Sequence, residues 1–282
     1  MFKIIRKKTL NPTVTLMEID APLVAKKAQA GQFIILRAND EGERIPLTIA
    51  DYDREKGTVT IIFQVVGATT EILNHMEEGD FIADFVGPLG KASEVEGLKR
   101  VAVIGGGVGC AIAYPTAKAL RENGAEVHSI IGFRNHDLVI LEEEFRAASD
   151  KLVVLTDDGS YGEKGLVTDA LKKLIESGEK YDEVIAIGPL VMMKFVSLLT
   201  KELGIKTVVS MNPVMIDGTG MCGGCRLTVG GEMKFACVDG PDFDGHQVDF
   251  DEAIRRSSMY KGQERHKHDE ACNLFKGGKE NA

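Results

Sequence analysis

The sequence predicts a chain of mixed β and α/β class: an antiparallel β-barrel, then a parallel-sheet α/β domain, then a small cysteine-bearing module. Three observations predict this order. Short strand patterns fill residues 1–97, strand and helix patterns alternate over residues 98–211, and regular periodicity fails over residues 212–282, where three cysteines cluster. A chain of 282 residues is long enough for several domains, because single cores seldom grow beyond about 250–300 residues.

The first segment consists of short apolar, β-branched stretches separated by turn residues such as Asn-Pro, Asn-Asp and Lys-Gly. About six strands in fewer than 100 residues favour a small antiparallel barrel. One short helix is expected over residues 69–76, with Thr69 or Thr70 as its N-cap. The expected strands are residues 14–19, 31–38, 45–52, 58–66 and 80–86.

The second segment follows a charged linker, residues 91–100, and alternates apolar strands with amphipathic helices. This alternation predicts a parallel sheet covered by helices on both faces. The expected strands are residues 101–105, 127–133, 152–156, 184–188 and 207–210, and the expected helices are residues 111–123, 141–148, 166–178 and 189–204.

A glycine-rich turn follows the first strand of this second segment and opens its first helix. It reads Gly105, Gly106, Gly107, Val108 and Gly109. Glycines let the backbone approach a pyrophosphate, and the helix N-terminus favours its charge. Tight packing alone is the other interpretation. The usual ribose-binding acid is missing, because the acid at the expected distance, Glu126, precedes the second strand instead of ending it. The spacing therefore indicates a nucleotide-binding family other than the ordinary Rossmann one.

Two motifs of the barrel segment also suit phosphate groups. Arg44 begins the strand Arg-Ile-Pro-Leu-Thr, and Gly67 begins the sequence Gly-Ala-Thr-Thr before the short helix. An arginine can pair with a phosphate, and a glycine followed by hydroxyls at a helix start can form a phosphate cradle. Each motif has an ordinary alternative, a solvated strand charge or a helix cap.

The cysteine cluster has the pattern Asp217-x4-Cys222-x2-Cys225-x11-Cys237. Plant-type [2Fe–2S] proteins use Cys-x4-Cys-x2-Cys and a more distant cysteine, so Asp217 stands in the place of the first thiolate. Nearby glycines allow the loop to wrap a cluster and to direct amides at its sulfurs. The spacing favours an iron–sulfur site in which a carboxylate alters the reduction potential.

Two alternatives for this cluster remain open. A structural zinc would take the three cysteines and His246. Asp217 would otherwise be only the first residue of an Asp-Gly turn, with Cys272 or water as the fourth ligand. The fifth cysteine, Cys110, is interpreted as a small packed side chain.

Taken in this order, with the Gly87–Gly90 and Gly188-Pro189 turns, the motifs of residues 1–210 resemble those of the ferredoxin reductase family. The resemblance implies an FAD-binding barrel and an NAD(H)-binding domain. It implies FAD contacts from Arg44, Pro46, Leu47, Thr48, Gly67, Thr69, Thr70, Gly87, Leu89 and Gly90. It implies nicotinamide nucleotide contacts from Gly105, Gly106, Gly107, Val108, Gly109, Gly188, Pro189 and Met192.

The cysteine cluster narrows the resemblance to electron-transfer subunits such as those of dihydroorotate dehydrogenase. Residues 211–226 are more similar to the small subunits of NADH-dependent ferredoxin:NADP oxidoreductases, which share the aspartate at position 217. The resemblance implies hydride exchange between NAD(H) and FAD, single-electron transfer through the [2Fe–2S] cluster, and a larger partner subunit with a second flavin and [4Fe–4S] clusters that supports electron bifurcation. A non-enzymatic nucleotide-sensing subunit with a zinc knuckle is the alternative from another class.

The choice between NADH and NADPH is expected to depend on Asp157 and Asp158, which follow the third strand of the sheet. Carboxylates there would repel a 2′-phosphate. Arg134 and Lys164 lie nearby in sequence and would have the opposite effect.

Charge and cysteine usage exclude other classes. With 34 basic and 43 acidic residues the formal charge is −9, which argues against nucleic-acid binding. An odd number of cysteines and an N-terminus without a signal-peptide apolar region predict a reduced, cytoplasmic protein. The longest apolar stretch, residues 101–114, is too short and glycine-interrupted to cross a membrane. The tail, residues 260–282, is expected to be mobile or to wrap a partner, with His266 and His268 on its solvated surface and Cys272 in no recognisable pattern.

Overall fold

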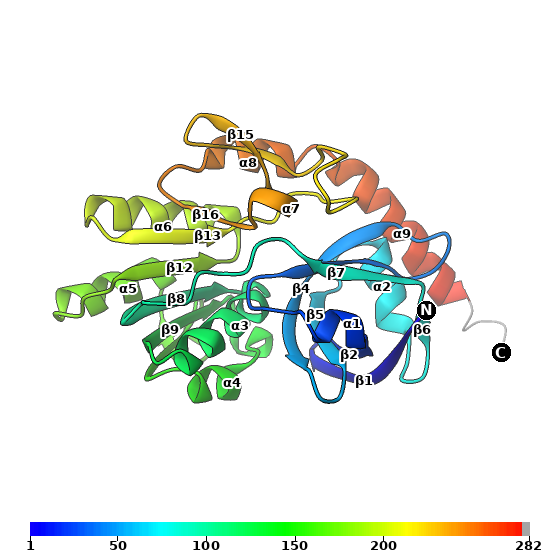
Figure 1. Ribbon diagram of the computed structural model, residues 1–282, viewed down its shortest axis with the longest axis horizontal. Coiled ribbons are helices and arrows are strands. Elements are labelled where there is room, and N and C mark those ends of the chain that lie inside the picture. The colour runs from blue at the N-terminus through cyan, green and yellow to red at the C-terminus, as the bar shows by residue number, and fades with distance from the viewer. Residues whose placement is uncertain (278–282) are drawn as a thin grey trace.

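The computed structural model describes the backbone of residues 1–277 and the side chains of residues 1–269. Figure 1 shows a barrel on the right, a helix-covered sheet on the left, and the C-terminal segment lying across the top of both. No helix among the described residues is both long and apolar enough to cross a membrane.

The barrel is a nearly closed sheet of seven strands in the order β6-β1-β2-β5-β4-β3-β7. Neighbouring strands are antiparallel, as predicted. Alternate side chains point inward, so that Ile34, Ile49, Ile61 and Phe63 are buried. The strands are β1 (Phe2–Asn11), β2 (Val14–Asp20), β3 (Phe33–Arg37), β4 (Arg44–Asp53), β5 (Thr58–Gln64), β6 (Phe81–Ile82) and β7 (Asp84–Leu89).

Two details of the barrel differ from the prediction. Strand β1 was not among the expected strands, because its basic residues obscure the alternation that Ile4, fully buried, marks in the structure. The single strand expected over residues 80–86 is divided into β6, which pairs with β1, and β7, which pairs with β3, so that the two strands form opposite edges of the sheet. Two short helices accompany the strands, α1 (Pro22–Ala25) and α2 (Ala68–His75).

The second sheet has the order β11-β10-β9-β8-β12-β13-β16. It is parallel, as predicted, except for β16, which comes from the C-terminal segment and pairs antiparallel with β13. Its strands are β8 (Arg100–Gly106), β9 (Glu126–Phe133), β10 (Lys151–Thr156), β11 (Glu163–Lys164), β12 (Glu183–Ile187), β13 (Lys206–Ser210) and β16 (Asp242–Asp244).

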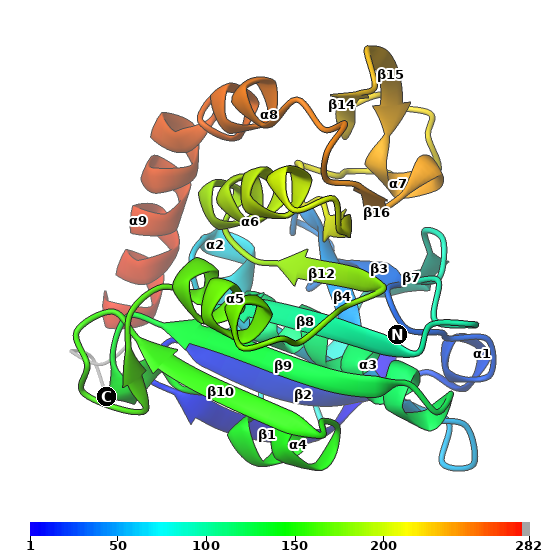
Figure 2. The ribbon, with the colours of Figure 1, turned by 90° about the vertical axis from the view of Figure 1, so that its left-hand side faces the viewer.

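Helices cover both faces of this sheet (Figure 2). One core joins α3 (Gly109–Glu122) and α4 (Glu142–Ala147) to one face, and another joins α5 (Val167–Glu176) and α6 (Leu190–Glu202) to the other. A short 3-10 helix, η1 (His136–Leu138), follows β9. Because both faces are buried, the strands are apolar on both sides.

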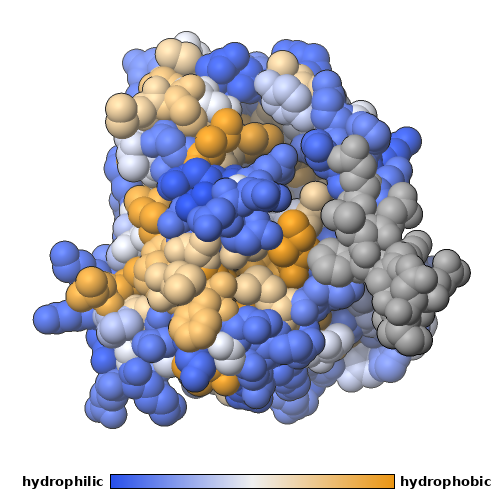
Figure 3. Space-filling model, turned by 90° about the vertical axis from the view of Figure 1, so that its right-hand side faces the viewer, coloured by the Kyte–Doolittle hydropathy of each residue, from blue (hydrophilic) through white to orange (hydrophobic). Residues whose placement is uncertain are grey.

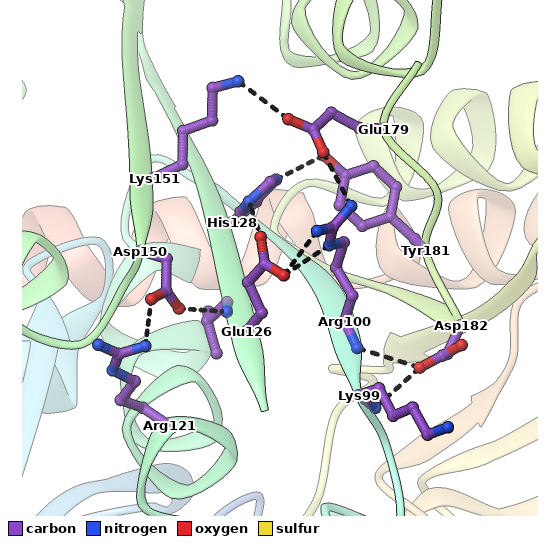
Figure 4. Close-up of polar contacts among 11 residues, drawn as sticks. Lys99, Arg100, Arg121, Glu126, His128, Asp150, Lys151, Glu179, Tyr181 and Asp182 are labelled. Carbon is purple, nitrogen blue, oxygen red and sulfur yellow. Dashed lines mark hydrogen bonds and ion pairs between the residues drawn. The ribbon is translucent and has the colours of Figure 1, made fainter. Parts of the chain in front are cut away.

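Polar side chains tie together the end of this sheet at which β8 and β9 begin (Figure 4). Arg100 forms ion pairs with Glu126 at 2.7 Å and with Glu179 at 3.0 Å. The buried ring of His128 lies between Glu126 and Tyr181, with Nδ1 2.9 Å from the tyrosine hydroxyl. Glu126 therefore belongs to the end of the sheet opposite the glycine-rich turn, which agrees with the expectation that it does not contact a ribose.

The C-terminal segment adds a hairpin, three helices and strand β16. The hairpin and helices are β14 (Arg226–Val229), β15 (Glu232–Phe235), α7 (Ala236–Asp239), α8 (Phe250–Ser257) and α9 (Lys261–Gly277). Helix α9 lies against α2 of the barrel. The tail that its charge predicts to be mobile or to wrap a partner is thus helical as far as residue 277. Packing against α2 stabilises this helix, because its sequence lacks apolar periodicity.

Candidate functional site

The two glycine turns of the parallel sheet meet at one edge. Strands β8 and β12 are neighbours, with Gly105 registered opposite Ile187. A Cβ on Gly109 would lie 2.5 Å from the carbonyl oxygen of Ile187 and 2.6 Å from Cα of Gly188. Only glycine fits such a contact, so Gly109 brings the start of α3 against the turn after β12.

Met192 and Pro189 close over the other side of the first turn. A Cβ on Gly106 would lie 2.5 Å from Sδ of Met192 and 3.1 Å from Cδ of Pro189. Gly107 takes a positive φ of 55°, and its N–H donates to the carbonyl of Gly132. The structure thus brings together residues for which the family resemblance implies contacts with a nicotinamide nucleotide.

Asp157 and Asp158 are exposed in the loop after β10. Asp158 accepts hydrogen bonds from the backbone N–H and the hydroxyl of Ser160, at 2.9 and 2.6 Å. These bonds hold the pKa of Asp158 below its usual value. Lys164 of β11 lies over Gly159 of this loop. Asp158 therefore shapes the loop through its bonds to Ser160.

The motif that begins at Arg44 lies on β4, the inner neighbour of β3. Thr48 is registered opposite Phe33, and Arg44 opposite Arg37. On the other side of β3, Leu89 of β7 is also registered with Phe33. Pro46 and Leu47 fall between these points on β4. The predicted flavin residues of two distant segments therefore flank one strand.

The turn before α2 is shaped by Thr70, whose hydroxyl accepts hydrogen bonds from the N–H groups of Val66 and Gly67, both at 3.0 Å. The N-cap is Gly67, so the expectation that Thr69 or Thr70 caps the helix is wrong. Thr69 and Thr70 are buried in the first turn of α2. Beside Gly67 no atom lies within 4 Å of a Cβ position, which leaves open space at the helix N-terminus.

The turn from Gly87 to Gly90 packs on β3 and reaches the C-terminal segment. A Cβ on Gly87 would lie 2.6 Å from Cγ2 of Ile34. Gly90, with φ of 75°, would place a Cβ 2.8 Å from the ring of Phe33 and 3.0 Å from Cδ of Pro241. The next residue, Lys91, donates its N–H to the carbonyl of Gly240 at 2.7 Å.

The four residues of the cysteine pattern fall into two pairs. Cys225 and Cys237 are buried with their sulfur atoms 3.3 Å apart. Cys222 is exposed, and its N–H donates to the carboxylate of Asp217 at 3.1 Å. Each iron of a [2Fe–2S] cluster takes two protein ligands, so two pairs of donors suit this group.

Backbone amides point at the sulfur atoms, as expected of an iron–sulfur loop. The N–H of Gly224 donates to Sγ of Cys222 at 3.4 Å. Burial raises the pKa of Cys237 to about 12 with a further contribution from Cys225, and the N–H of Gly220 opposes this rise. Hydrogen bonds from Thr219 and Cys222 hold the pKa of Asp217 well below its usual range.

The zinc alternative finds no support in the geometry. Among the described side chains, no three histidine, cysteine, aspartate or glutamate residues are grouped to hold one metal ion. The ring of His246 has Nε2 3.0 Å from the hydroxyl of Thr200 on α6. The other alternative ligand, Cys272, belongs to α9, and its side chain lies outside the described residues.

The cysteine-bearing loop rests on the barrel. Nε of Arg44 donates a hydrogen bond to the carbonyl of Ile216 at 3.0 Å. Gly218, with φ of 79°, would place a Cβ 2.8 Å from both Ile35 of β3 and Leu89 of β7. The spacing of residues in the sequence does not predict these contacts of the loop with the barrel, because neither Ile216 nor Ile35 belongs to a motif.

Sequence reasoning also missed Asp242 and Ser93, which join the parts of the chain. The Ser93 hydroxyl donates to Asp242 at 2.6 Å, and the Ser93 N–H donates to the barrel carbonyl of Ala30.

On the right-hand face of Figure 1, apolar side chains gather around a hollow (Figure 3). Exposed apolar residues of the loop include Val214, Ile216 and Met221.

Comparison with known proteins gives matches over nearly the whole chain. The iron–sulfur cluster binding domain of dihydroorotate dehydrogenase B matches residues 212–249. An uncharacterized protein in the adh 3′ region of Clostridium beijerinckii is 57% identical over 272 residues, covering 94% of this chain and 92% of that protein. The dihydroorotate dehydrogenase B (NAD(+)) electron transfer subunit homolog of Thermotoga maritima is 49% identical over 263 residues, covering 93% of each.

One solved structure is similar over the same extent. It was described in work on flavin-based electron bifurcation by the NADH-dependent reduced ferredoxin-NADP oxidoreductase. The matching chain is 45% identical with a TM-score of 0.91, covering 96% of this chain and 97% of that one.

Proposed function

Because the chain belongs to the family of dihydroorotate dehydrogenase B electron-transfer subunits and their homologues, we propose that it is an electron-transfer subunit that binds FAD, NAD(H) and one [2Fe–2S] cluster. The observation that carries this proposal is the seating of the cysteine-bearing loop on β3, β4 and β7, the strands of the predicted flavin site. When bound, FAD exchanges a hydride with NAD(H), and the cluster carries single electrons.

The chain's own residues position these groups. Arg44 and the N-terminus of α2 would hold the FAD phosphates, and Thr48 and the Gly87–Gly90 turn would border the flavin ring. The remaining proposed FAD contacts are Pro46, Leu47, Gly67, Thr69, Thr70 and Leu89. The nucleotide contacts are Gly105, Gly106, Gly107, Val108, Gly109, Gly188, Pro189 and Met192. Glycine at positions 106, 109 and 188 lets the backbones of the two turns lie close together.

For the cluster we propose Asp217 and Cys222 as ligands of one iron and Cys225 and Cys237 as ligands of the other. The sulfur pair at 3.3 Å and the contact between Asp217 and the Cys222 amide support this division. Deprotonated, these donors bring four negative charges, of which a core of two ferric irons and two sulfides would offset about half. The amides of Gly220 and Gly224 would stabilise the remaining charge on the sulfurs.

NADH is the proposed nucleotide. Asp157 is exposed in the loop after β10, where it would repel a 2′-phosphate. We expect kcat/KM for NADH to exceed that for NADPH, and Asp157→Ser to narrow the ratio about tenfold, which corresponds to about 1.4 kcal/mol. The matched control is Asp137→Ser, which removes a surface carboxylate after β9. A wild-type preference for NADPH would contradict this proposal.

A larger partner subunit is the proposed redox partner, and the family to which the chain belongs supports it. As its specific composition we propose a second flavin and [4Fe–4S] clusters, as in an electron-bifurcating complex. The exposed side chains of Ile216 and Met221 beside Cys222 support a contact close to the cluster. A reducing cytoplasm is the compartment that suits its thiols.

Spectroscopy of the protein purified without oxygen tests the proposal. We expect flavin absorbance, visible bands of a [2Fe–2S] centre, and two irons per chain. NADH should bleach the flavin bands, and a reduced cluster should give an electron paramagnetic resonance signal. Protein that lacks both flavin and iron, yet binds zinc at the cysteines, would favour the nucleotide-sensing alternative instead.

A further inference from the structure

The arginine of the flavin motif also holds the iron–sulfur loop. Arg44 is half-buried on β4, and its Nε–H donates to the carbonyl of Ile216, 172 residues later in the chain and next to Asp217. A guanidinium is planar, with five N–H donors in a fixed fork. The bond at Nε therefore fixes the plane of the two terminal nitrogens, and these four N–H groups remain for a phosphate.

A second contact joins the same loop to the barrel. At Gly218 the backbone passes so close to Ile35 and Leu89 that a methyl group would lie 2.8 Å from each. The flanking side chains of Ile216 and Met221 are 51% and 88% exposed, so little else covers this part of the loop. The loop is also held by Val238, which lies close to Gly220, and by Arg256, which donates to the carbonyl of Gly224, but its contacts with the barrel are those of Arg44, Ile35 and Leu89.

Resting on the proposed function, we infer that Arg44 couples the two cofactor sites, so that FAD and the [2Fe–2S] cluster each increase the retention of the other. A phosphate on the terminal nitrogens orders the Arg44 side chain, and the ordered side chain presents Nε–H to the Ile216 carbonyl. A loop held in place keeps Asp217 and Cys222 together. Coupling between two sites is reciprocal, so the cluster must strengthen FAD binding by the same factor.

The experiment measures cluster loss to an iron chelator, followed by visible absorbance, in protein with and without FAD. In the wild type we expect FAD to slow the loss by about fivefold or more, the usual lower range of such coupling. The dissociation constant of FAD, from flavin fluorescence, should be larger in cluster-free protein, which is the reciprocal effect at equilibrium. These readouts do not depend on catalytic turnover.

Variants separate the coupling from simple loss of binding. For Arg44→Ala, the rate of cluster loss without FAD divided by the rate at saturating FAD should fall to about 1. In Gly218→Ala the ratio should also fall, while cluster-free protein keeps wild-type FAD affinity because Arg44 is retained. The matched control is Arg37→Ala, because Arg37 is registered opposite Arg44 but pairs with Asp84 and Asp40. It should keep the wild-type ratio.

Two results would overturn the inference: a wild-type ratio of 1, or an Arg44→Ala ratio equal to that of the wild type. Circular dichroism of each variant confirms that it is folded. Wild-type protein that binds neither FAD nor a [2Fe–2S] cluster would overturn the proposed function, and the inference with it. Protein that binds both without coupling would overturn the inference alone.

Discussion

At the scale of single residues, the site depends on a few positions where side-chain chemistry or the lack of a side chain decides the geometry. Asp217 is such a position because its carboxylate is held by Thr219 and by the Cys222 amide. Oδ1 accepts from both the N–H and the hydroxyl of Thr219, whereas Oδ2 accepts only from the Cys222 amide, so Oδ2 keeps a lone pair with which Asp217 can bind iron.

We expect Asp217→Cys to retain two irons and to shift the cluster potential by on the order of tens of millivolts, because thiolate is a softer ligand than carboxylate. Asp217→Ala should lose the cluster or change its resonance spectrum. The measurements are iron content, electron paramagnetic resonance and redox titration, with Asp239→Ala as a control. An unchanged spectrum and potential in Asp217→Ala would exclude its role as a ligand.

Gly109 is the corresponding position at the nucleotide site. We expect Gly109→Ala to weaken NADH binding at least tenfold, since the added methyl would lie 2.5 Å from the Ile187 carbonyl and separate the two turns. The overpacking should also lower the free energy of unfolding by about 1–3 kcal/mol. Equilibrium titration and urea unfolding measure the two effects. Gly262→Ala, in open space on α9, is the matched substitution that should change neither.

At the scale of elements, the parallel sheet has chemically different ends. Its glycine turns lie at one end, and the Arg100 network joins β8 and β9 at the other (Figure 4). Arg100 holds the pKa of Glu126 below its usual value, and the amides of Arg100 and Lys99 do the same for Asp182. These carboxylates favour the fold only when they are charged.

A carboxyl whose native pKa is lowered stabilises the fold above its unfolded pKa, and this contribution is lost as the pH falls through the native pKa. We therefore expect wild-type stability to fall below about pH 4. Arg100→Met should be less stable at pH 7, and its difference from the wild type should shrink as the pH is lowered. Urea unfolding across this range tests the prediction. Arg146→Met, which breaks an exposed pair within α4, should have a smaller effect.

At the scale of the whole molecule, the linker is fixed where the barrel, the parallel sheet and the C-terminal segment meet. Ser93 contacts Ala30 of the barrel, and its hydroxyl donates to Asp242 of β16, which is paired with β13. Oδ1 of Asp242 is buried without a hydrogen-bond partner. Burial raises the pKa of Asp242, and the hydroxyls of Ser93 and Ser210 oppose the rise only in part.

A raised native pKa stabilises the fold below the unfolded pKa, and that contribution is lost as the pH rises through the native pKa. Asn keeps an acceptor for Ser93 without the charge. We therefore expect Asp242→Asn to gain stability relative to the wild type between pH 4.5 and pH 8, by about 1 kcal/mol. A constant difference across this range would contradict the prediction. Asp242→Ala, which also removes the acceptor for Ser93, should be less stable than Asp242→Asn at both pH 4.5 and pH 8.

Much of the fold followed from local pattern, because period-two and helical alternation are properties of consecutive residues. The antiparallel barrel and the parallel sheet were predicted in this way. Strand β1 and helix α9 were not, since their charges hide apolar periodicity and packing against β2 and α2 decides their structure. The N-cap of α2 was assigned wrongly because Thr70 bonds backward from the third helical position.

The sequence by itself determined which chemical groups are present: the glycine turns, the spacing of Asp217 with three cysteines, and the resemblance that these motifs carry. Only the tertiary structure decided which of them meet. Contacts such as Arg44 with Ile216, or Gly218 with Leu89, join residues more than 120 positions apart. Such contacts arise from the packing of the cysteine-bearing loop on the barrel, and no local spacing encodes them.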